Sequence, residues 1–126
     1  MDAAVCLYGY YGRYYGRGAE ESPVSSPVHL DATAAPPFFL AHGEHDSYVP
    51  VEQGRGFVEH LRDQTHREVV YAELPAAQHG FDLFNSWRFA AVVDGIDAFC
   101  AATLNHGATP PRADDAASYG SPLVDQ

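Results

Sequence analysis

The sequence has few cysteines, few basic residues and no long apolar run, and each scarcity excludes a class of protein. Two cysteines among 126 residues are too few for a disulfide framework. The apolar contexts of Cys6 and Cys100 predict that both are small buried hydrophobic residues. Seven Lys and Arg residues against seventeen Asp and Glu residues give a formal net charge of −10. Such a chain has no basic surface that could neutralise the phosphates of a nucleic acid.

A membrane span and a secretion signal are not expected either. No stretch approaches the roughly 18 consecutive apolar residues of a transmembrane helix. No positively charged N-terminus precedes an apolar run, as it would in a signal peptide. The sequence therefore predicts a soluble, cytoplasmic protein without a membrane span. Hydrophobic residues make up 46% of the chain, which at this length predicts one folded domain with a modest core.

Three short apolar runs predict strands, and two periodic segments predict helices. The runs cover residues 3–8, 38–41 and 69–74. The second run does not alternate, which is typical of a parallel strand covered on both faces. One helix is expected with Pro50 in its first turn and with an apolar face formed by Gly54, Phe57, Val58 and Leu61. The other is expected after an N-cap at Ser86, with its apolar face formed by Phe89, Val92, Val93, Ile96, Phe99 and Cys100.

The order strand, long connection, strand, helix, strand, helix predicts an α/β fold. We expect about three parallel strands in a piece of doubly wound sheet, with helices packed on its faces. Residues 9–35 are rich in Gly, Tyr, Ser and Pro and are expected to connect the first two strands over the mouth of a pocket. Residues 105–126 are rich in Pro, Ala and Asp without periodicity, and we expect a disordered tail there.

Asp46 and His79 are the candidate catalytic residues. Asp46 follows the strand of residues 38–41, and His79 follows the strand that ends at Leu74. Because reactive groups in open α/β sheets gather outside the carboxyl ends of the strands, we expect the two side chains to meet there. His79 would then accept a proton as a general base, while Asp46 would hold the other ring nitrogen.

These residues also have structural interpretations. A lone aspartate before a helix is commonly a turn or cap residue, and a lone histidine before glycine is commonly a polar loop residue. Asp82 is a competing acid, which we expect to order the loop or the entry of the last helix. Zinc-ligand types also cluster at His42, Glu44, His45 and Asp46. Their spacing matches no established signature and no cysteine lies near, so we expect neither a metal nor a cofactor.

Around these residues the sequence resembles the C-terminal part of the α/β-hydrolase fold, particularly the actinobacterial, mycobacterial-type carboxylesterases and lipases. The similarity spans about residues 1–104 and is carried by the segments Pro36–Gly43, Asp46–Pro50 and Gln78–Asp82. Each motif alone is weak, whereas the three at these distances form a fairly specific combination. The resemblance implies that Asp46 is the triad acid and His79 the triad base of a carboxylic ester hydrolase.

The resemblance also shows a departure from the family. The Gly-x-Ser-x-Gly elbow that carries the nucleophile is absent, because no serine has glycine at both the −2 and +2 positions: Ser22, Ser25, Ser26, Ser47, Ser86, Ser118 and Ser121. The oxyanion loop and the earlier central strands are missing as well. We therefore expect a fragment that is inactive alone and acts on a small-molecule ester only when another chain supplies the missing half.

Two alternatives remain open. In the first, the chain is a non-catalytic remnant that acts as an interaction module. The edge of its first strand would lack its usual neighbour and would favour association, and the Tyr-rich segment Tyr8–Tyr15 would add to the contact surface. In the second, the chain barely folds, which a cooperative thermal unfolding transition would contradict.

Overall fold

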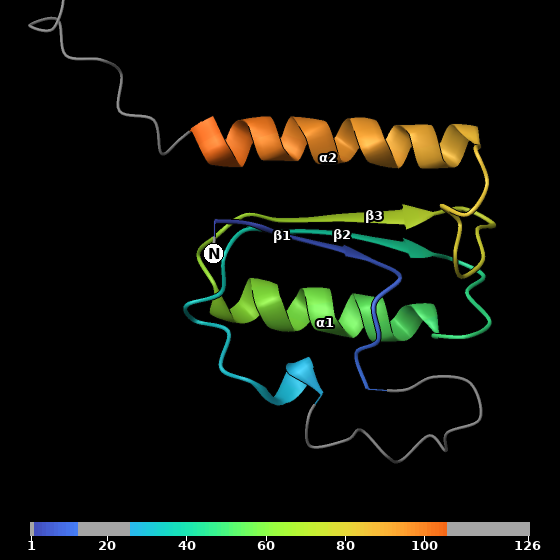
Figure 1. Ribbon diagram of the computed structural model, residues 1–126. Coiled ribbons are helices and arrows are strands. Elements are labelled where there is room, and N and C mark those ends of the chain that lie inside the picture. The colour runs from blue at the N-terminus through green and yellow to red at the C-terminus, as the bar shows by residue number, and fades with distance from the viewer. Residues whose placement is uncertain (1, 13–25, 106–126) are drawn as a thin grey trace, which may run out of the picture.

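The computed structural model describes residues 2–12 and 26–105, which form a parallel sheet between two helices (Figure 1). The elements, in chain order, are β1 (Ala4–Leu7), the short 3₁₀ helix η1 (Pro27–His29), β2 (Phe38–Gly43), α1 (Val51–Gln64), β3 (Val69–Leu74) and α2 (Trp87–Asn105). The predicted α/β fold class is confirmed. Residues 13–25 of the expected connection over a pocket, and the expected disordered tail beyond Asn105, lie outside the described residues.

The three strands run parallel in the spatial order β1-β2-β3. Ala4 pairs with Phe38 at one end of the β1–β2 ladder, and Gly43 pairs with Leu74 at the far end of the β2–β3 ladder. The carboxyl ends of all three strands therefore lie on the same edge of the sheet (Figure 1). In this arrangement the loops that follow β2 and β3 are neighbours, although they are about thirty residues apart in sequence.

Both faces of β2 are covered, as the lack of alternation in its sequence predicts. Leu40 belongs to a core cluster on the α1 side of the sheet, together with Phe57, Val58 and Leu61. Phe39 and Ala41 belong to a second cluster on the α2 side. Successive residues of a strand point to opposite faces, so an uninterrupted apolar run is required where a helix lies on each side (Figure 1).

The start of each helix follows from local chemistry. Pro50 is the N-cap of α1, one residue before the first turn in which it was predicted. Its missing N–H is not needed there, because the first N–H groups of a helix have no partner within the helix. The predicted apolar face of α1 is buried as expected: Gly54, Phe57, Val58 and Leu61. Ser86 precedes α2, and its Oγ accepts a hydrogen bond from the Phe89 N–H at 3.2 Å. That bond confirms the predicted N-cap.

The predicted apolar face of α2 is only partly correct. Val92 and Phe99 are buried, but Val93 is 39% exposed. A three-stranded sheet is narrow and covers a limited arc of the helix. The covered arc includes Val92, Ile96 and Phe99, whereas Val93 lies beside this arc.

The neighbouring valines of α2 provide a stability test. We expect Val92→Ala to lower the free energy of unfolding by about 2 kcal/mol, because it removes buried methyl groups and leaves a cavity. Val93→Ala, in the same helix, is expected to change it by less than about 0.5 kcal/mol. Urea denaturation followed by circular dichroism measures both. Equal losses would show that Val93 is covered in solution.

The two cysteines are free and half-buried, and so less buried than predicted. Cys6 packs against the α1-side cluster and Cys100 against the α2-side cluster. The two thiols therefore lie on opposite faces of the sheet. Burial raises the pKa of the Cys6 thiol, which keeps it in the less reactive protonated form.

Candidate active site

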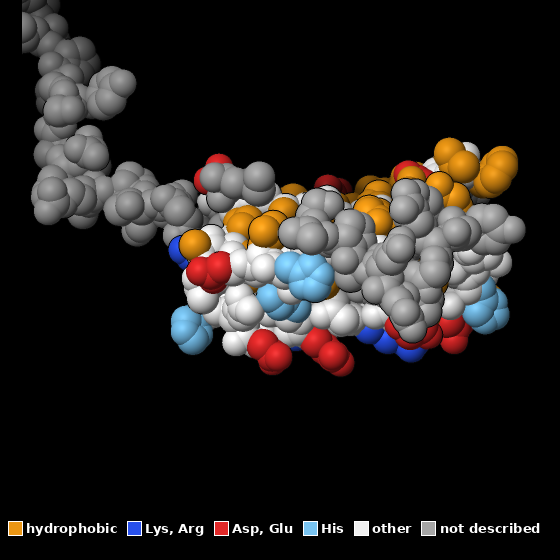
Figure 2. All heavy atoms as spheres, turned by 90° about the horizontal axis from the view of Figure 1, so that it is seen from below, with side chains coloured by type: hydrophobic (Ala, Val, Ile, Leu, Met, Phe, Trp, Pro, Cys, Tyr) orange, Lys and Arg blue, Asp and Glu red, His pale blue; other side chains and the backbone are white. Residues whose placement is uncertain are grey.

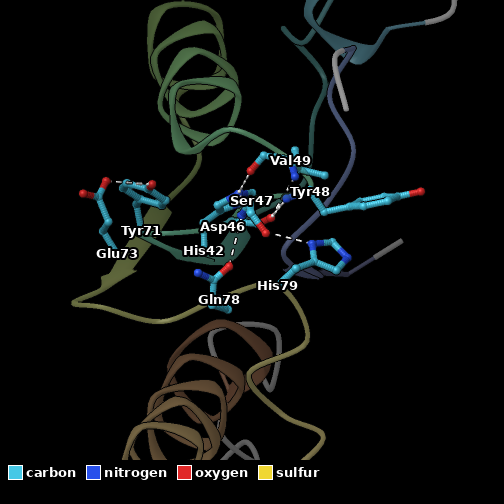
Figure 3. Close-up of polar contacts among 9 residues, drawn as sticks. All are labelled: His42, Asp46, Ser47, Tyr48, Val49, Tyr71, Glu73, Gln78 and His79. Atoms are coloured by element: carbon cyan, nitrogen blue, oxygen red, sulfur yellow. Dashed lines mark hydrogen bonds and ion pairs between the residues drawn. The ribbon is translucent and has the colours of Figure 1, made fainter. Parts of the chain in front are cut away.

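Asp46 and His79 lie in two loops that are joined by hydrogen bonds at the carboxyl edge of the sheet. The Glu44 N–H donates to the Leu74 carbonyl and the His45 N–H donates to the Ala77 carbonyl, both at 3.0 Å. In the same region the Ser47 N–H donates to Oε1 of Gln78 at 3.2 Å (Figure 3). These bonds hold the loop after β2 directly against the loop after β3.

The carboxylate of Asp46 is fully buried and has a different set of partners at each oxygen. Oδ1 accepts hydrogen bonds from the backbone N–H groups of Tyr48 at 2.9 Å and Val49 at 2.7 Å. Oδ2 accepts from Nδ1 of His79 at 2.8 Å, and the Asp46 side chain is 0% exposed. Asp46 is therefore both a turn residue, as one interpretation predicted, and the partner of His79, as the other predicted.

The bond to Asp46 sets the tautomer of His79. An ionised carboxylate can only accept hydrogen bonds, so Nδ1 of His79 carries the proton. In the neutral ring Nε2 then carries the lone pair. The ring edge of His79 that carries Nδ1 points to the buried Asp46 (Figure 3). The His79 side chain as a whole is 33% exposed. This arrangement is the one that a general base requires.

Two aromatic rings pack beside His79 at tilted angles. The Tyr8 ring centroid lies 4.5 Å from that of His79, and the Tyr48 ring centroid lies 5.0 Å away. Rings at such distances stabilise a positive charge on an imidazolium. The Tyr8 hydroxyl donates to Oδ1 of Asp82 at 2.8 Å, and this bond raises the pKa of Tyr8. No sequence pattern indicated that Tyr8, directly after β1, contacts His79.

Asp82 does not replace Asp46 as the partner of His79 Nδ1. Its carboxylate accepts the Tyr8 hydroxyl bond and so connects the loop after β3 to the end of β1. The expectation that Asp82 orders its loop is confirmed. The neighbouring Gly80 has φ of +70°, a left-handed conformation that glycine adopts without strain.

The zinc-ligand cluster of the sequence does not converge. Among the described residues no group of three or more His, Cys, Asp or Glu side chains could hold a metal ion. His45 is exposed and Glu44 accepts a bond from the Ala76 N–H, whereas His42 is buried at the base of the Asp46 loop. His42 lies 3.4 Å from Asp46 and His45 lies 3.9 Å from Glu44, so the four residues form two separate pairs rather than one site.

Exposed apolar side chains follow the histidine loop. Leu83, Phe84 and Trp87 are each at least 70% exposed, and they lie between His79 and the first turn of α2. Seen from below, hydrophobic side chains gather along the upper margin of the molecule, with a few acidic ones among them (Figure 2). Neither helix within the described ranges has the length and apolar character needed to cross a bilayer.

Comparison with protein families gives a match over most of the chain. The model of the prolyl oligopeptidase family matches residues 10–106. Two curated proteins of Mycobacterium tuberculosis are similar. The probable carboxylic ester hydrolase LipM is 48% identical over 89 residues, which are 68% of this chain and 21% of LipM. The esterase LipC is 44% identical over 75 residues, which are 60% of this chain and 19% of LipC.

Comparison with solved structures gives the same fold. Esterase 2 of Thermogutta terrifontis, phosphonylated by cyclosarin, superposes with a TM-score of 0.66 at 24% identity, over 88% of this chain and 43% of the esterase. The propionate-bound form of that enzyme gives a TM-score of 0.64 at 22% identity, over 89% of this chain and 45% of the esterase. The chain spans about a fifth of the length of the curated relatives and less than half of these esterase structures.

Proposed function

The chain belongs to the prolyl oligopeptidase family, within the α/β-hydrolase fold, and from this premise we propose that it supplies the acid and the base of a serine-dependent ester hydrolase. One observation carries the proposal: the 2.8 Å hydrogen bond between Nδ1 of His79 and the fully buried carboxylate of Asp46. The bond lies at the carboxyl edge of a parallel sheet, where the active sites of open α/β folds are found.

In the proposed reaction, His79 Nε2 removes the proton from a serine hydroxyl as it attacks the ester carbonyl. The proton is later returned to the leaving alcohol. Asp46 keeps the Nδ1–H in place and stabilises the imidazolium that forms during attack. The rings of Tyr8 and Tyr48, whose centroids lie 4.5 and 5.0 Å from that of His79, add to that stabilisation.

We propose that the serine nucleophile comes from polypeptide outside these 126 residues. None of the serines stands in Gly-x-Ser-x-Gly. Ser26 is buried and donates to the Tyr11 carbonyl, and Ser86 caps α2. These two hydroxyls are occupied by structural hydrogen bonds. Because no serine of the chain has the elbow motif, we expect the chain by itself to lack triad-dependent turnover.

Carboxylic esters are the proposed substrate class. The family name refers to a peptidase, but the two curated relatives at 48% and 44% identity are named as a carboxylic ester hydrolase and an esterase. Identity of this size to two named ester hydrolases favours the ester reaction. Hydrolysis of a prolyl peptide substrate by the reassembled enzyme would favour the peptidase reaction instead.

We propose that the complementing polypeptide joins at the edge of β1. Within the described residues β1 pairs with β2 on one side only, and Val5 on this strand is 42% exposed. An unpaired strand edge readily accepts another strand. The Tyr-rich part of the interaction-module alternative fits less well, because Tyr11 is buried and stacks on Phe57. Residues 13–15 lie outside the described residues.

Complementation tests this function. The purified chain is assayed with p-nitrophenyl butyrate alone, and after co-expression with the part of LipM that lies outside the 89 aligned residues. We expect background hydrolysis by the chain alone, turnover by the reassembled enzyme, and loss of that turnover with His79→Ala. Turnover by the chain alone that disappears with His79→Ala would show a nucleophile within this sequence. A stable complex without turnover would favour the interaction module.

A further inference from the structure

His42 is the last buried polar side chain of β2 before the Asp46 loop, and the proposed reaction does not use it. The residue is 1% exposed and its ring points toward α1, where Gly54 lies against it. A Cβ atom added at Gly54 would stand 3.2 Å from Nδ1 of His42 and 3.3 Å from its Cγ. The ring is therefore enclosed, and its orientation is fixed by packing.

One ring nitrogen of His42 is bonded to the loop that holds Asp46. Nε2 lies 2.9 Å from the Val49 carbonyl oxygen. Because a carbonyl can only accept, Nε2 carries the proton and donates it. The same residue, Val49, donates its N–H to Oδ1 of Asp46 at 2.7 Å. Nε2 of His42 also lies 3.4 Å from Oδ2 of Asp46, the oxygen that receives the bond from His79 (Figure 3).

The other ring nitrogen of His42 is buried and has no hydrogen-bond partner within the described part of the chain. Glu73 stands opposite His42 in the β2–β3 register, but its carboxylate binds Arg55 and the Tyr71 hydroxyl. Arg55 holds the pKa of Glu73 below its ordinary value, so this carboxylate stays ionised and paired. An unpaired buried nitrogen costs free energy that an apolar side chain would avoid. A role for His42 is therefore expected in the bond that the other nitrogen, Nε2, makes to the Val49 carbonyl.

We propose that His42 is a positioning residue for the Asp46–His79 pair. It holds the carbonyl group of Val49 in place. The N–H group on the other side of the Val49 Cα donates to Oδ1 and so orients the Asp46 carboxylate. Oδ2 is then held in line with Nδ1 of His79. The role of His42 rests on the proposed function, because it acts only through Asp46 and touches neither the substrate nor the reacting atoms.

The Nδ1–H proton of His79 tests this role in the 126-residue chain without any enzyme assay. In a sample labelled with nitrogen-15, its resonance is assigned by its loss in His79→Ala, and its exchange with water is measured by NMR. Glutamine can place an amide donor near the position of Nε2, whereas asparagine is too short. We expect His42→Asn to speed exchange about tenfold, the factor for loss of one hydrogen bond, and His42→Gln to restore most of the protection.

A second pair of variants leaves His42 in place. Gly54→Ala presses on the His42 ring, whereas Gly56→Ala in the same helix meets nothing within 4 Å. We expect faster Nδ1–H exchange in Gly54→Ala than in Gly56→Ala. These variants decide the question if His42→Asn does not fold, as judged by circular dichroism.

The outcomes separate the two proposals. If the unmodified chain shows no protected Nδ1–H proton at His79, the Asp46–His79 bond does not form and the proposed function fails. If the proton is protected and its exchange is the same in folded His42→Asn, His42→Gln and Gly54→Ala, the role of His42 is overturned and the proposed function stands. Faster exchange in His42→Asn and Gly54→Ala, with rescue in His42→Gln, supports the positioning role.

Discussion

Asp46→Asn is expected to lower kcat of the reassembled hydrolase by roughly 10⁴-fold, with little change in folding. Asparagine has nearly the same shape, and its carbonyl oxygen can accept the N–H bonds of Tyr48 and Val49 that Oδ1 now accepts. Its NH₂ group then faces Nδ1 of His79. Because that group donates, Nδ1 must become the acceptor and the ring proton moves to Nε2. The ring can then no longer remove a proton from the serine.

The measurement is kcat with p-nitrophenyl butyrate, together with the NMR assignment of the protonated nitrogen of His79. Asp82→Asn is the matched control, because Asp82 is the nearby acid that binds Tyr8 rather than Nδ1 of His79. We expect its activity to fall by no more than about tenfold, the factor for loss of one hydrogen bond. A greater loss in Asp82→Asn than in Asp46→Asn would reassign the triad acid.

Gly43→Ala is expected to destabilise the chain by about 3 kcal/mol, the upper end for overpacking a rigid site. An added Cβ would lie 2.4 Å from the carbonyl oxygen of Ala77 and 2.8 Å from its carbonyl carbon. Both are backbone atoms, and the adjacent bond from the His45 N–H to the same carbonyl prevents an easy shift. The two loops would separate, and Asp46 would move away from His79.

Thermal unfolding measures this effect, and a loss of that size lowers Tm by more than about 10 °C in a domain this small. Gly56→Ala is the control, since its Cβ meets nothing within 4 Å and alanine favours a helix. We expect Gly56→Ala to raise stability by up to about 1 kcal/mol. Equal Tm values for the two variants would show that the loops do not pack as closely as described. A chain without a cooperative transition would revive the alternative that it barely folds.

Much of the fold could be predicted from the sequence because it depends on local periodicity. The uninterrupted run Phe38–Ala41 required cover on both faces, and α1 and α2 supply it. The caps at Pro50 and Ser86 depend on residues within one turn of each helix. Val93 was mispredicted because periodicity reports which residues are apolar, whereas its exposure depends on the width of the sheet beneath α2.

The sequence by itself determined the element types, the parallel order, and which acid and histidine follow the strand ends. These follow from hydrophobic spacing and from the rule that parallel strands end at one edge. Only the tertiary structure decided that Asp46 accepts a hydrogen bond from His79, that the Tyr8 ring packs against the histidine ring, and that His42 binds the Val49 carbonyl. The physical reason is that the contacts to His79 join residues more than thirty positions apart. The one local contact, His42 to Val49, depends on a ring orientation that Gly54 on α1 sets.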